Sequence, residues 1–272
     1  MPIEIKFDIP ENLSWKEKLP GVIGAPGFVR PLEGRRVEAV LETLSSQNKT
    51  IGSSFIYNGI KSIPSQNGAE TIICNFSLDG YVNNLAEAIS MTLSNPNVNP
   101  SRIGIFASSI SGAVSAYFLA QNPKFQIRSI AFISPLVGWN YYGTAQQREF
   151  IKKLREENKI SPSAKNSFIP ITTKYDIQRD IKRYIPIECL DELEKIDGIN
   201  ALDNYRNQSI KVMTFIGEKD DVASPDSMIN FHRKLGGGDE TYLLKYHEHG
   251  HAIPIEDIME PALEFFKKTL AE

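Results

Sequence analysis

Hydrophobic residues gather along this chain in short, nearly continuous runs that are rich in Val, Ile and Phe. Such runs are typical of strands that are buried on both faces of a sheet. Between most of the runs, apolar residues recur every three or four positions, as on one face of a helix. The predicted strands are residues 3–9, 21–25, 51–57, 102–107, 127–134, 210–216 and 241–246.

The stretches of helical spacing follow the strands in turn. In the first of them, the apolar face consists of Val37, Val40, Leu41 and Leu44. Alternation of strand and helix favours a mostly parallel sheet that carries helices on both faces, so the predicted fold class is α/β. The predicted helices are residues 35–46, 81–93, 110–120, 224–235 and 254–270.

Residues 135–208 break this alternation, because they separate two strands by far more chain than a crossover needs. They contain the basic residues Lys152, Lys153 and Arg155 and a later segment of mixed charge. We interpret this region as a helical cap inserted above the carboxyl edge of the sheet, and its charges as a solvated helix face. The predicted domains are therefore a core of residues 1–134 and 209–272 and a cap of residues 135–208.

A serine-rich turn joins the buried strand at residues 102–107 directly to the next helix. A nucleophile on such a turn stands at the edge of the sheet, provided that the residues two before and two after it are small. Both Ser109 and Ser111 fit this spacing. Ser109 fits better, because it lies at the end of the strand and the helix starts at once. The alternative is a turn whose serines only cap the helix.

A second group of polar residues follows the strand at residues 210–216. Here Gly217 is followed by Glu-Lys and then by the neighbouring carboxylates Asp220 and Asp221. A carboxylate at a strand end suits the acid of a hydrolase triad, where it orients a histidine. Asp220 is the favoured candidate, because it stands three residues after the glycine. The alternative is a turn in which both aspartates cap the following helix.

The segment HEHGH follows the last predicted strand and holds His247, His249 and His251. Alternating histidines can bind a metal, but no matched ligand cluster is evident elsewhere in the chain, so we expect no metal. A Gly-His step between the last strand and the last helix suits a general base, which favours His251. Along the chain the candidate nucleophile Ser109 comes first, the candidate acid Asp220 second and the candidate base His251 third. This is one of the known chain orders of a catalytic triad.

These motifs resemble those of the α/β-hydrolase superfamily, and the resemblance extends from about residue 21 to the C-terminus. It implies that an oxyanion hole is formed by the N–H groups of Phe28 and Ile110. The family's usual histidine before the glycine of the first loop is replaced by Pro26. The run ASSIS is similar to the ASSxS elbow of the acyl-transferase/thioesterase family of bacterial luminescence, and the layout is similar to that of small feruloyl-esterase-type and monoacylglycerol-lipase-type enzymes.

The resemblance implies hydrolysis of a small-molecule ester or thioester through an acyl-enzyme, without a cofactor. Trp139 and Tyr142 lie in an aromatic segment after the strand at residues 127–134 and are candidates for the substrate pocket. They could equally pack the cap onto the sheet. The alternatives for the whole chain are an acyltransferase, a small serine peptidase and a non-catalytic binding member of the fold.

Composition narrows the class of protein further. The 272 residues are 41% hydrophobic and carry 30 Lys and Arg against 33 Asp and Glu, so that the net charge is −3. This balance gives no reason to expect nucleic acid or an anionic membrane as a partner. Two cysteines rule out a disulfide scaffold, and the acidic N-terminal segment does not resemble a signal peptide. We expect a cytoplasmic protein, and a homodimer is compatible with the sequence.

Overall fold

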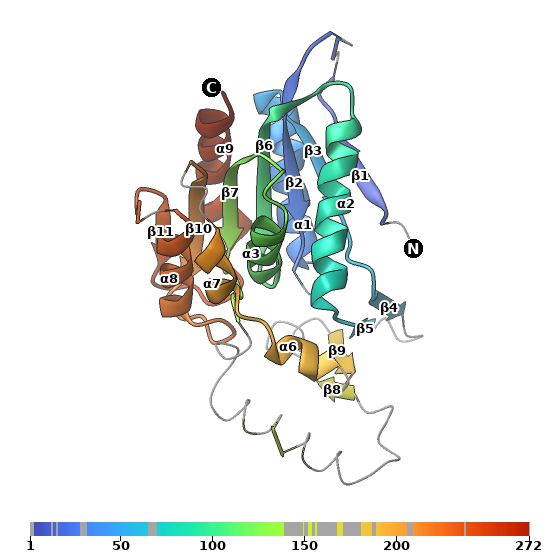
Figure 1. Cartoon of the computed structure of the whole chain (residues 1–272), viewed down its shortest axis with the longest axis vertical. Helices are drawn as coiled ribbons and strands as arrows, with labels where there is room; N and C mark the ends of the chain where they lie inside the picture. The colour runs from blue at the N-terminus through green and yellow to red at the C-terminus, as the bar shows by residue number, and fades with distance from the viewer. Residues whose placement is uncertain are drawn as a thin grey trace.

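A seven-stranded sheet forms the centre of the computed structural model (Figure 1). Its strands run in the order β1-β3-β2-β6-β7-β10-β11, and all neighbouring pairs are parallel except β1 and β3. The strands are β1 (Ile5–Asp8), β2 (Leu19–Ala25), β3 (Ile51–Phe55), β6 (Val98–Ser108), β7 (Ile127–Ile133), β10 (Lys211–Gly217) and β11 (Leu243–Tyr246). The structure describes residues 3–11, 13–14, 16–27, 32–64, 70–138, 149, 152–153, 156, 168–170, 181–186, 189–205, 209–236 and 238–271.

Helices cover both faces of this sheet, which confirms the predicted fold class. Alternate residues of the central strands enter different cores: Ile105 packs on one side, and Phe106 meets Phe266 on the other, with ring centroids 6.1 Å apart. The strands read as continuous apolar runs because both of their faces are buried. One face carries α1 (Leu32–Asn48) and α9 (Ile255–Ala271), and the other carries α2 (Leu78–Ser94), α3 (Ser111–Gln121) and α8 (Pro225–Leu235).

A second, four-stranded sheet lies beyond the beginning of α2 (Figure 1). Its order is β4-β5-β9-β8, and only the β5–β9 pair is parallel. The region 135–208 therefore contains strands where we expected helices only, and they pair with a hairpin that the sequence analysis missed. The elements are β4 (Ile60–Pro64), β5 (Glu70–Cys74), β8 (Phe168–Pro170), β9 (Ile181–Pro186), α6 (Leu190–Glu194), α7 (Gly198–Ala201) and the short 3-10 helix η4 (Leu202–Asn204).

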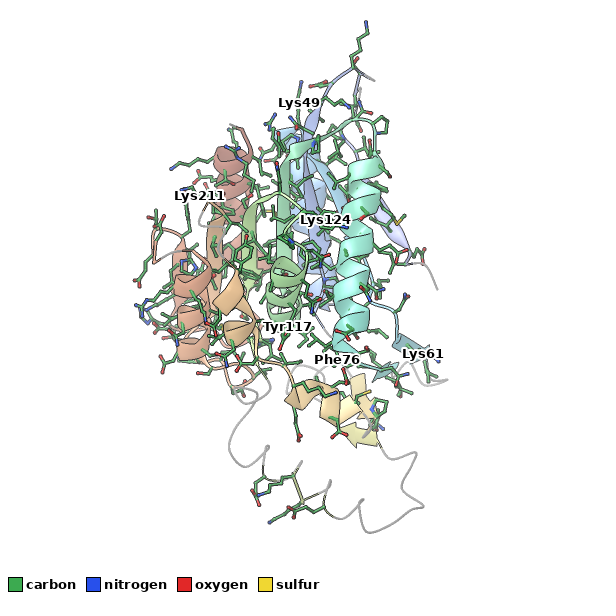
Figure 2. The ribbon with its side chains drawn as sticks, in the orientation of Figure 1. Lys49, Lys61, Phe76, Tyr117, Lys124 and Lys211 are labelled. Atoms are coloured by element: carbon green, nitrogen blue, oxygen red, sulfur yellow. The ribbon has the colours of Figure 1, made fainter. Side chains whose placement is uncertain are left out.

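Hydrogen bonds from α3 hold the segment between α6 and α7 against the core. The Tyr117 hydroxyl donates to the Lys195 carbonyl and accepts from the Asp197 N–H, both at 3.1 Å. Tyr117 is labelled on α3 in Figure 2. The Gly198 N–H adds a 2.6 Å bond to the carbonyl of Val137, beyond the end of β7. Among the helices of the described ranges, none has the length and apolar content to cross a membrane.

A histidine on α8 is buried and makes two hydrogen bonds. His232 is fully buried; its Nε2 donates to the Asp239 carbonyl at 2.8 Å, so its Nδ1 accepts from the Thr214 hydroxyl at 2.9 Å. This arrangement requires the neutral imidazole. Burial lowers the pKa of His232 below its ordinary value of 6.5.

We predict that this histidine makes the protein less stable as the pH falls. Below about pH 6.5 the unfolded chain binds a proton at His232 that the folded chain binds only at lower pH, so the free energy of unfolding decreases. The slope from this one group reaches at most about 1.4 kcal/mol per pH unit. Urea unfolding of wild type and His232→Gln between pH 8 and 5 should show a shallower decrease in the variant. Parallel curves would contradict the assignment.

Candidate active site

The turn after β6 places Ser109 in a backbone conformation that few side chains adopt. Its φ angle is +52°, in the left-handed region, and α3 begins two residues later. A non-glycine residue persists there only where its surroundings hold it. The Ser109 N–H donates to the Ile133 carbonyl at 3.0 Å, and its carbonyl accepts from Gly112 at 2.9 Å and Leu136 at 2.8 Å. The turn is therefore fixed on both sides of the serine.

The structure brings Ser109, His251 and Asp220 together in a line of two hydrogen bonds. Ser109 Oγ lies 3.0 Å from His251 Nε2, and His251 Nδ1 lies 2.8 Å from Asp220 Oδ2. A carboxylate only accepts, so Nδ1 carries the proton and Nε2 is left to accept the Ser109 hydroxyl. The side chain of His251 is only 10% exposed and that of Asp220 is fully buried.

Backbone N–H groups orient the Asp220 carboxylate. Its other oxygen, Oδ1, accepts from Val222 at 2.8 Å and from Ala223 at 2.9 Å. Asp221, the alternative acid in the sequence analysis, is exposed at the surface. The carboxylate that is buried and faces the imidazole is thus the one three residues after Gly217.

The acid turn and the histidine loop touch backbone to backbone at Gly217. The Lys219 N–H donates to the His249 carbonyl at 2.9 Å. A Cβ atom on Gly217 would lie 2.2 Å from the Gly250 carbonyl oxygen, which leaves no room for any side chain. A glycine at this position is a sequence signal for the close approach of two backbone segments, beyond its use in locating Asp220.

Each histidine of HEHGH contacts a different carboxylate. His247 bonds to Glu218, His249 Nε2 lies 2.8 Å from Asp257 Oδ2, and His251 faces Asp220. The three imidazoles therefore point toward separate partners rather than toward one centre. Within the described ranges, no group of three or more His, Cys, Asp or Glu side chains is placed to hold a metal ion.

Ser111, the alternative nucleophile, has different contacts. It is fully buried at the start of α3, and its hydroxyl bonds to the Pro26 carbonyl and lies 2.7 Å from the Tyr57 hydroxyl. Neither contact is evident from the sequence. Of the two serines, only Ser109 bonds to His251 in the described structure.

The surroundings of the Ser109 hydroxyl suit the development of negative charge. The N–H of Ile110 lies at the N-terminus of α3, where backbone N–H groups have no partner in the preceding turn. No acceptor for this N–H is found within the described ranges. Ala25 pairs with Ala107 across β2 and β6, so the loop that follows β2 begins beside the serine turn. Phe28, Trp139 and Tyr142 lie outside the described residues.

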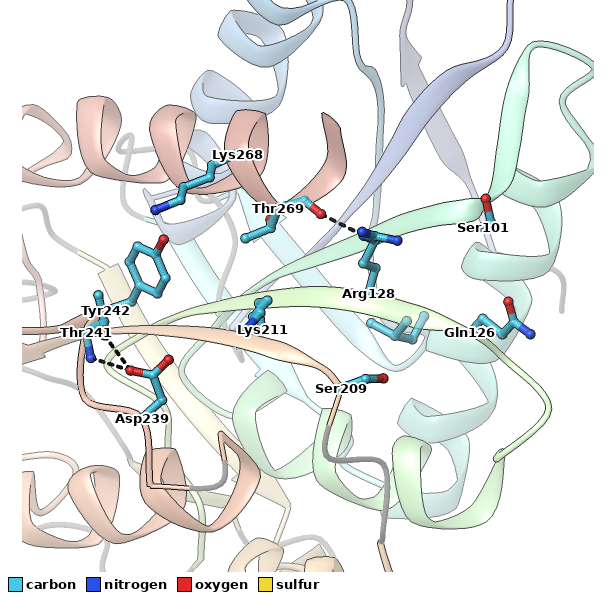
Figure 3. A pocket seen from close by; sticks show the side chains of 11 residues that line it. Ser101, Gln126, Arg128, Ser209, Lys211, Asp239, Thr241, Tyr242, Lys268 and Thr269 are labelled. Atoms are coloured by element: carbon cyan, nitrogen blue, oxygen red, sulfur yellow. Dashed lines mark hydrogen bonds between the residues drawn. The ribbon is translucent and has the colours of Figure 1, made fainter. Parts of the chain in front are cut away.

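A cavity of about 750 Å³ opens at the opposite edge of the sheet (Figure 3). It lies where β7 and β10 begin, whereas Ser109 and Asp220 follow the ends of their strands. Two of the cations that line it have partners: Arg128 donates to the Thr269 carbonyl at 2.9 Å, and Lys268 Nζ lies 5.8 Å from the centre of the Tyr242 ring. The cavity is therefore separate from the Ser109 site.

Solved structures show which known fold this arrangement matches. No family model and no curated protein sequence matches the chain. The α/β hydrolase GrgF from Penicillium sp. sh18 superposes with a TM-score of 0.70 at 14% identity over 100% of both chains. Est1E from Butyrivibrio proteoclasticus, bound to ferulic acid, gives 0.67 at 16% identity, over 99% of this chain and 96% of that chain.

A monoacylglycerol lipase from Paleococcus ferrophilus gives a TM-score of 0.65 at 13% identity over 99% of this chain and 100% of that chain. At sequence identities of 13–16%, these similarities show the fold alone. The strand order, the helices on both faces and the near-complete coverage agree with one another. The chain has the α/β-hydrolase fold.

Proposed function

We propose that this chain is a serine hydrolase that cleaves carboxylic esters or thioesters through an acyl-enzyme. The observation that carries the proposal is the continuous path from Ser109 through His251 to the buried Asp220, with distances of 3.0 and 2.8 Å. A serine hydroxyl is a weak nucleophile, and a hydrogen-bonded imidazole removes its proton as it attacks. In this role Ser109 is the nucleophile, His251 the general base and Asp220 the group that orients the base.

In the first half of the reaction, Ser109 Oγ bonds to the acyl carbon and its proton passes to His251 Nε2. Asp220 stabilises the resulting imidazolium. The tetrahedral intermediate then releases the alcohol or thiol, which takes the proton from His251, and the acyl group stays on Ser109. In the second half, water attacks the ester while His251 accepts its proton, and the same sequence frees the acid and Ser109.

The developing oxyanion needs donors on the side of Ser109 away from His251. The Ile110 N–H is one candidate, and the N–H of Phe28, in the loop after β2, is the other. Donors that are already in place stabilise the oxyanion without reorganising, and each contributes roughly 10²–10³-fold in rate. The chain itself supplies the nucleophile, the base, the acid and the oxyanion donors of this mechanism, and the water of the second half comes from solvent.

Two proteins that share the fold support the choice of an ester as substrate. Est1E is seen with ferulic acid and the Paleococcus protein is a monoacylglycerol lipase, which favours ester substrates. Residues 135–208 form the cap above the core of residues 1–134 and 209–272, and the hairpin β4–β5 extends it. Trp139 and Tyr142, which lie outside the described residues, are the candidates for the acyl pocket that the sequence offers. The protein acts in the cytoplasm on a small molecule.

A substrate panel tests the proposed function. Purified wild type should hydrolyse at least one of a set of p-nitrophenyl esters, acyl-CoA thioesters and hydroxycinnamate esters with saturation kinetics. Ser109→Ala should lower kcat by roughly 10⁴–10⁶-fold, since only binding and oxyanion stabilisation remain. Ser108→Ala, a neighbouring buried serine outside the hydrogen-bonded path, should retain most activity. Equal activity of Ser109→Ala and wild type would contradict the proposal.

Asp220 and its neighbour Asp221 allow a matched pair of variants to be compared. Asp220→Asn should lower kcat by about 10³–10⁴-fold, because an amide neither fixes the required imidazole tautomer nor stabilises the imidazolium. Asp221→Asn removes an equivalent charge at the surface and should stay within about twofold of wild type. Steady-state assays of both variants on the best substrate decide the matter. Similar losses in the two would mean that Asp220 does not orient the base.

The proposed base also predicts the pH profile of the reaction. The rate of wild type should fall on the acid side of neutrality, because protonated His251 cannot accept the Ser109 proton. Initial rates between pH 5 and 9, measured where the fold is intact by circular dichroism, test this. A flat profile across the whole range would argue against a histidine base.

A further inference from the structure

Ser111 is buried two residues after the proposed nucleophile, at a position where the turn demands a small residue. It is 0% exposed, so it cannot touch a substrate. A glycine would satisfy the space of the turn, whereas serine adds a hydroxyl that must be hydrogen-bonded when buried. That hydroxyl bonds to the Pro26 carbonyl and to Tyr57. Ser111 therefore supplies hydrogen bonds in addition to the small size that the turn requires.

The direction of these hydrogen bonds follows from the chemistry of the partners. The Pro26 carbonyl only accepts, so the single proton of Ser111 is donated to it. The Tyr57 hydroxyl, 2.7 Å from Ser111 Oγ, must then donate to the serine. The chain of donors runs from Tyr57 to Ser111 and ends on Pro26. Loss of the tyrosine hydroxyl would leave Ser111 without its donor but with its bond to Pro26.

Aromatic rings hold the beginning of this chain in place. Tyr57 is 1% exposed and stacks on Tyr81 of α2, with ring centroids 4.1 Å apart and planes 3° from parallel. The ring centroids of Phe55 and Tyr57 are 5.0 Å apart in a T-shaped contact, and those of Phe76 and Tyr81 are 4.9 Å apart in another. Burial raises the pKa of Tyr57 well above its ordinary value, so the hydroxyl keeps its proton and remains a donor.

The two ends of the bond belong to the two halves of the proposed oxyanion hole. Ser111 directly follows Ile110, whose N–H is one proposed donor. The Pro26 carbonyl is part of the peptide plane that joins Pro26 to Gly27, one plane before the N–H of Phe28, the other proposed donor. Peptide units are planar, so a hydrogen bond that holds the Pro26 carbonyl also orients the whole Pro26–Gly27 peptide unit. The next unit, which carries the Phe28 N–H, continues from that orientation.

We propose that Ser111, supported by Tyr57, is a positioning residue that sets the spacing of the two oxyanion donors by tying the serine turn to the loop after β2. This inference rests on the proposed function and adds to it a residue that does not contact the substrate. The resemblance leads one to expect a histidine where Pro26 stands. In this chain, Ser111 at the start of α3 holds the Pro26 carbonyl by a hydrogen bond.

Kinetics of three variants test the role. Ser111→Ala should lower kcat by about 10- to 100-fold and leave KM within about twofold, because a misplaced donor loses part of its contribution to the transition state only. Tyr57→Phe keeps the rings and should cost less, about three- to tenfold. The double variant should be no worse than Ser111→Ala, since Tyr57 acts through Ser111.

Ser115→Ala is the matched control. Ser115 lies one turn further along α3, is 0% exposed, and its Oγ makes no hydrogen bond within the described structure. It should keep kcat and KM near wild type. A boronic acid that forms a tetrahedral adduct with Ser109 provides a second readout. Its affinity should fall in Ser111→Ala by the same factor as kcat/KM, a correspondence that a general loss of stability would not produce.

Two different failures can be told apart. If wild type hydrolyses a substrate but Ser111→Ala and Tyr57→Phe behave as Ser115→Ala does, the positioning role is wrong and the proposed function stands. A change in KM alone, or a lower melting temperature with unchanged kcat, would also overturn the role. If wild type hydrolyses nothing in the panel, the proposed function is wrong and this inference falls with it.

Discussion

The left-handed backbone of Ser109 is the constraint on which the rest of the site depends. Such a conformation is unfavourable by about 1–3 kcal/mol for a residue with a side chain, so neighbouring structure must hold it. Here the support comes from three backbone hydrogen bonds, to Ile133, Gly112 and Leu136. They belong to β7, to α3 and to the segment after β7. The sheet and α3 thus determine where the Ser109 turn is held, and His251 is placed to meet its hydroxyl.

Parallel strands explain why distant residues meet there. Ser109 follows β6 and Asp220 follows β10, and the carboxyl ends of parallel strands share one edge of the sheet. His251 follows β11, which pairs with β10, and the missing side chain of Gly217 lets its loop approach the acid turn. The same edge receives the loop after β2, whose Pro26 carbonyl bonds to Ser111. Side-chain hydrogen bonds and one close backbone approach bring these four segments together.

Much of the main sheet and of the candidate site could be predicted from the sequence. Buried parallel strands give continuous apolar runs, and the turns after three of them contain a serine, an aspartate and a histidine that stand out. All seven strands of the main sheet were found in this way, and Ser109 was separated from Ser111 by its place at the strand end. The second sheet was missed, since β5 pairs with a strand far along the chain, β9, in a register that sets Glu70 opposite Ile181. Local patterns carry no information on such pairing. The bond from Ser111 to Pro26 escaped notice for the same reason.

The central claim is that Ser109 is a nucleophile activated by its neighbours, and covalent labelling tests it most directly. Intact protein treated with a fluorophosphonate should gain the mass of one phosphonyl group, and peptide mapping should place that group on Ser109. Serines without an adjacent base do not react, so the label reports activation as well as position. A label on Ser111, on another residue, or no label under conditions that modify a known serine hydrolase would contradict the account.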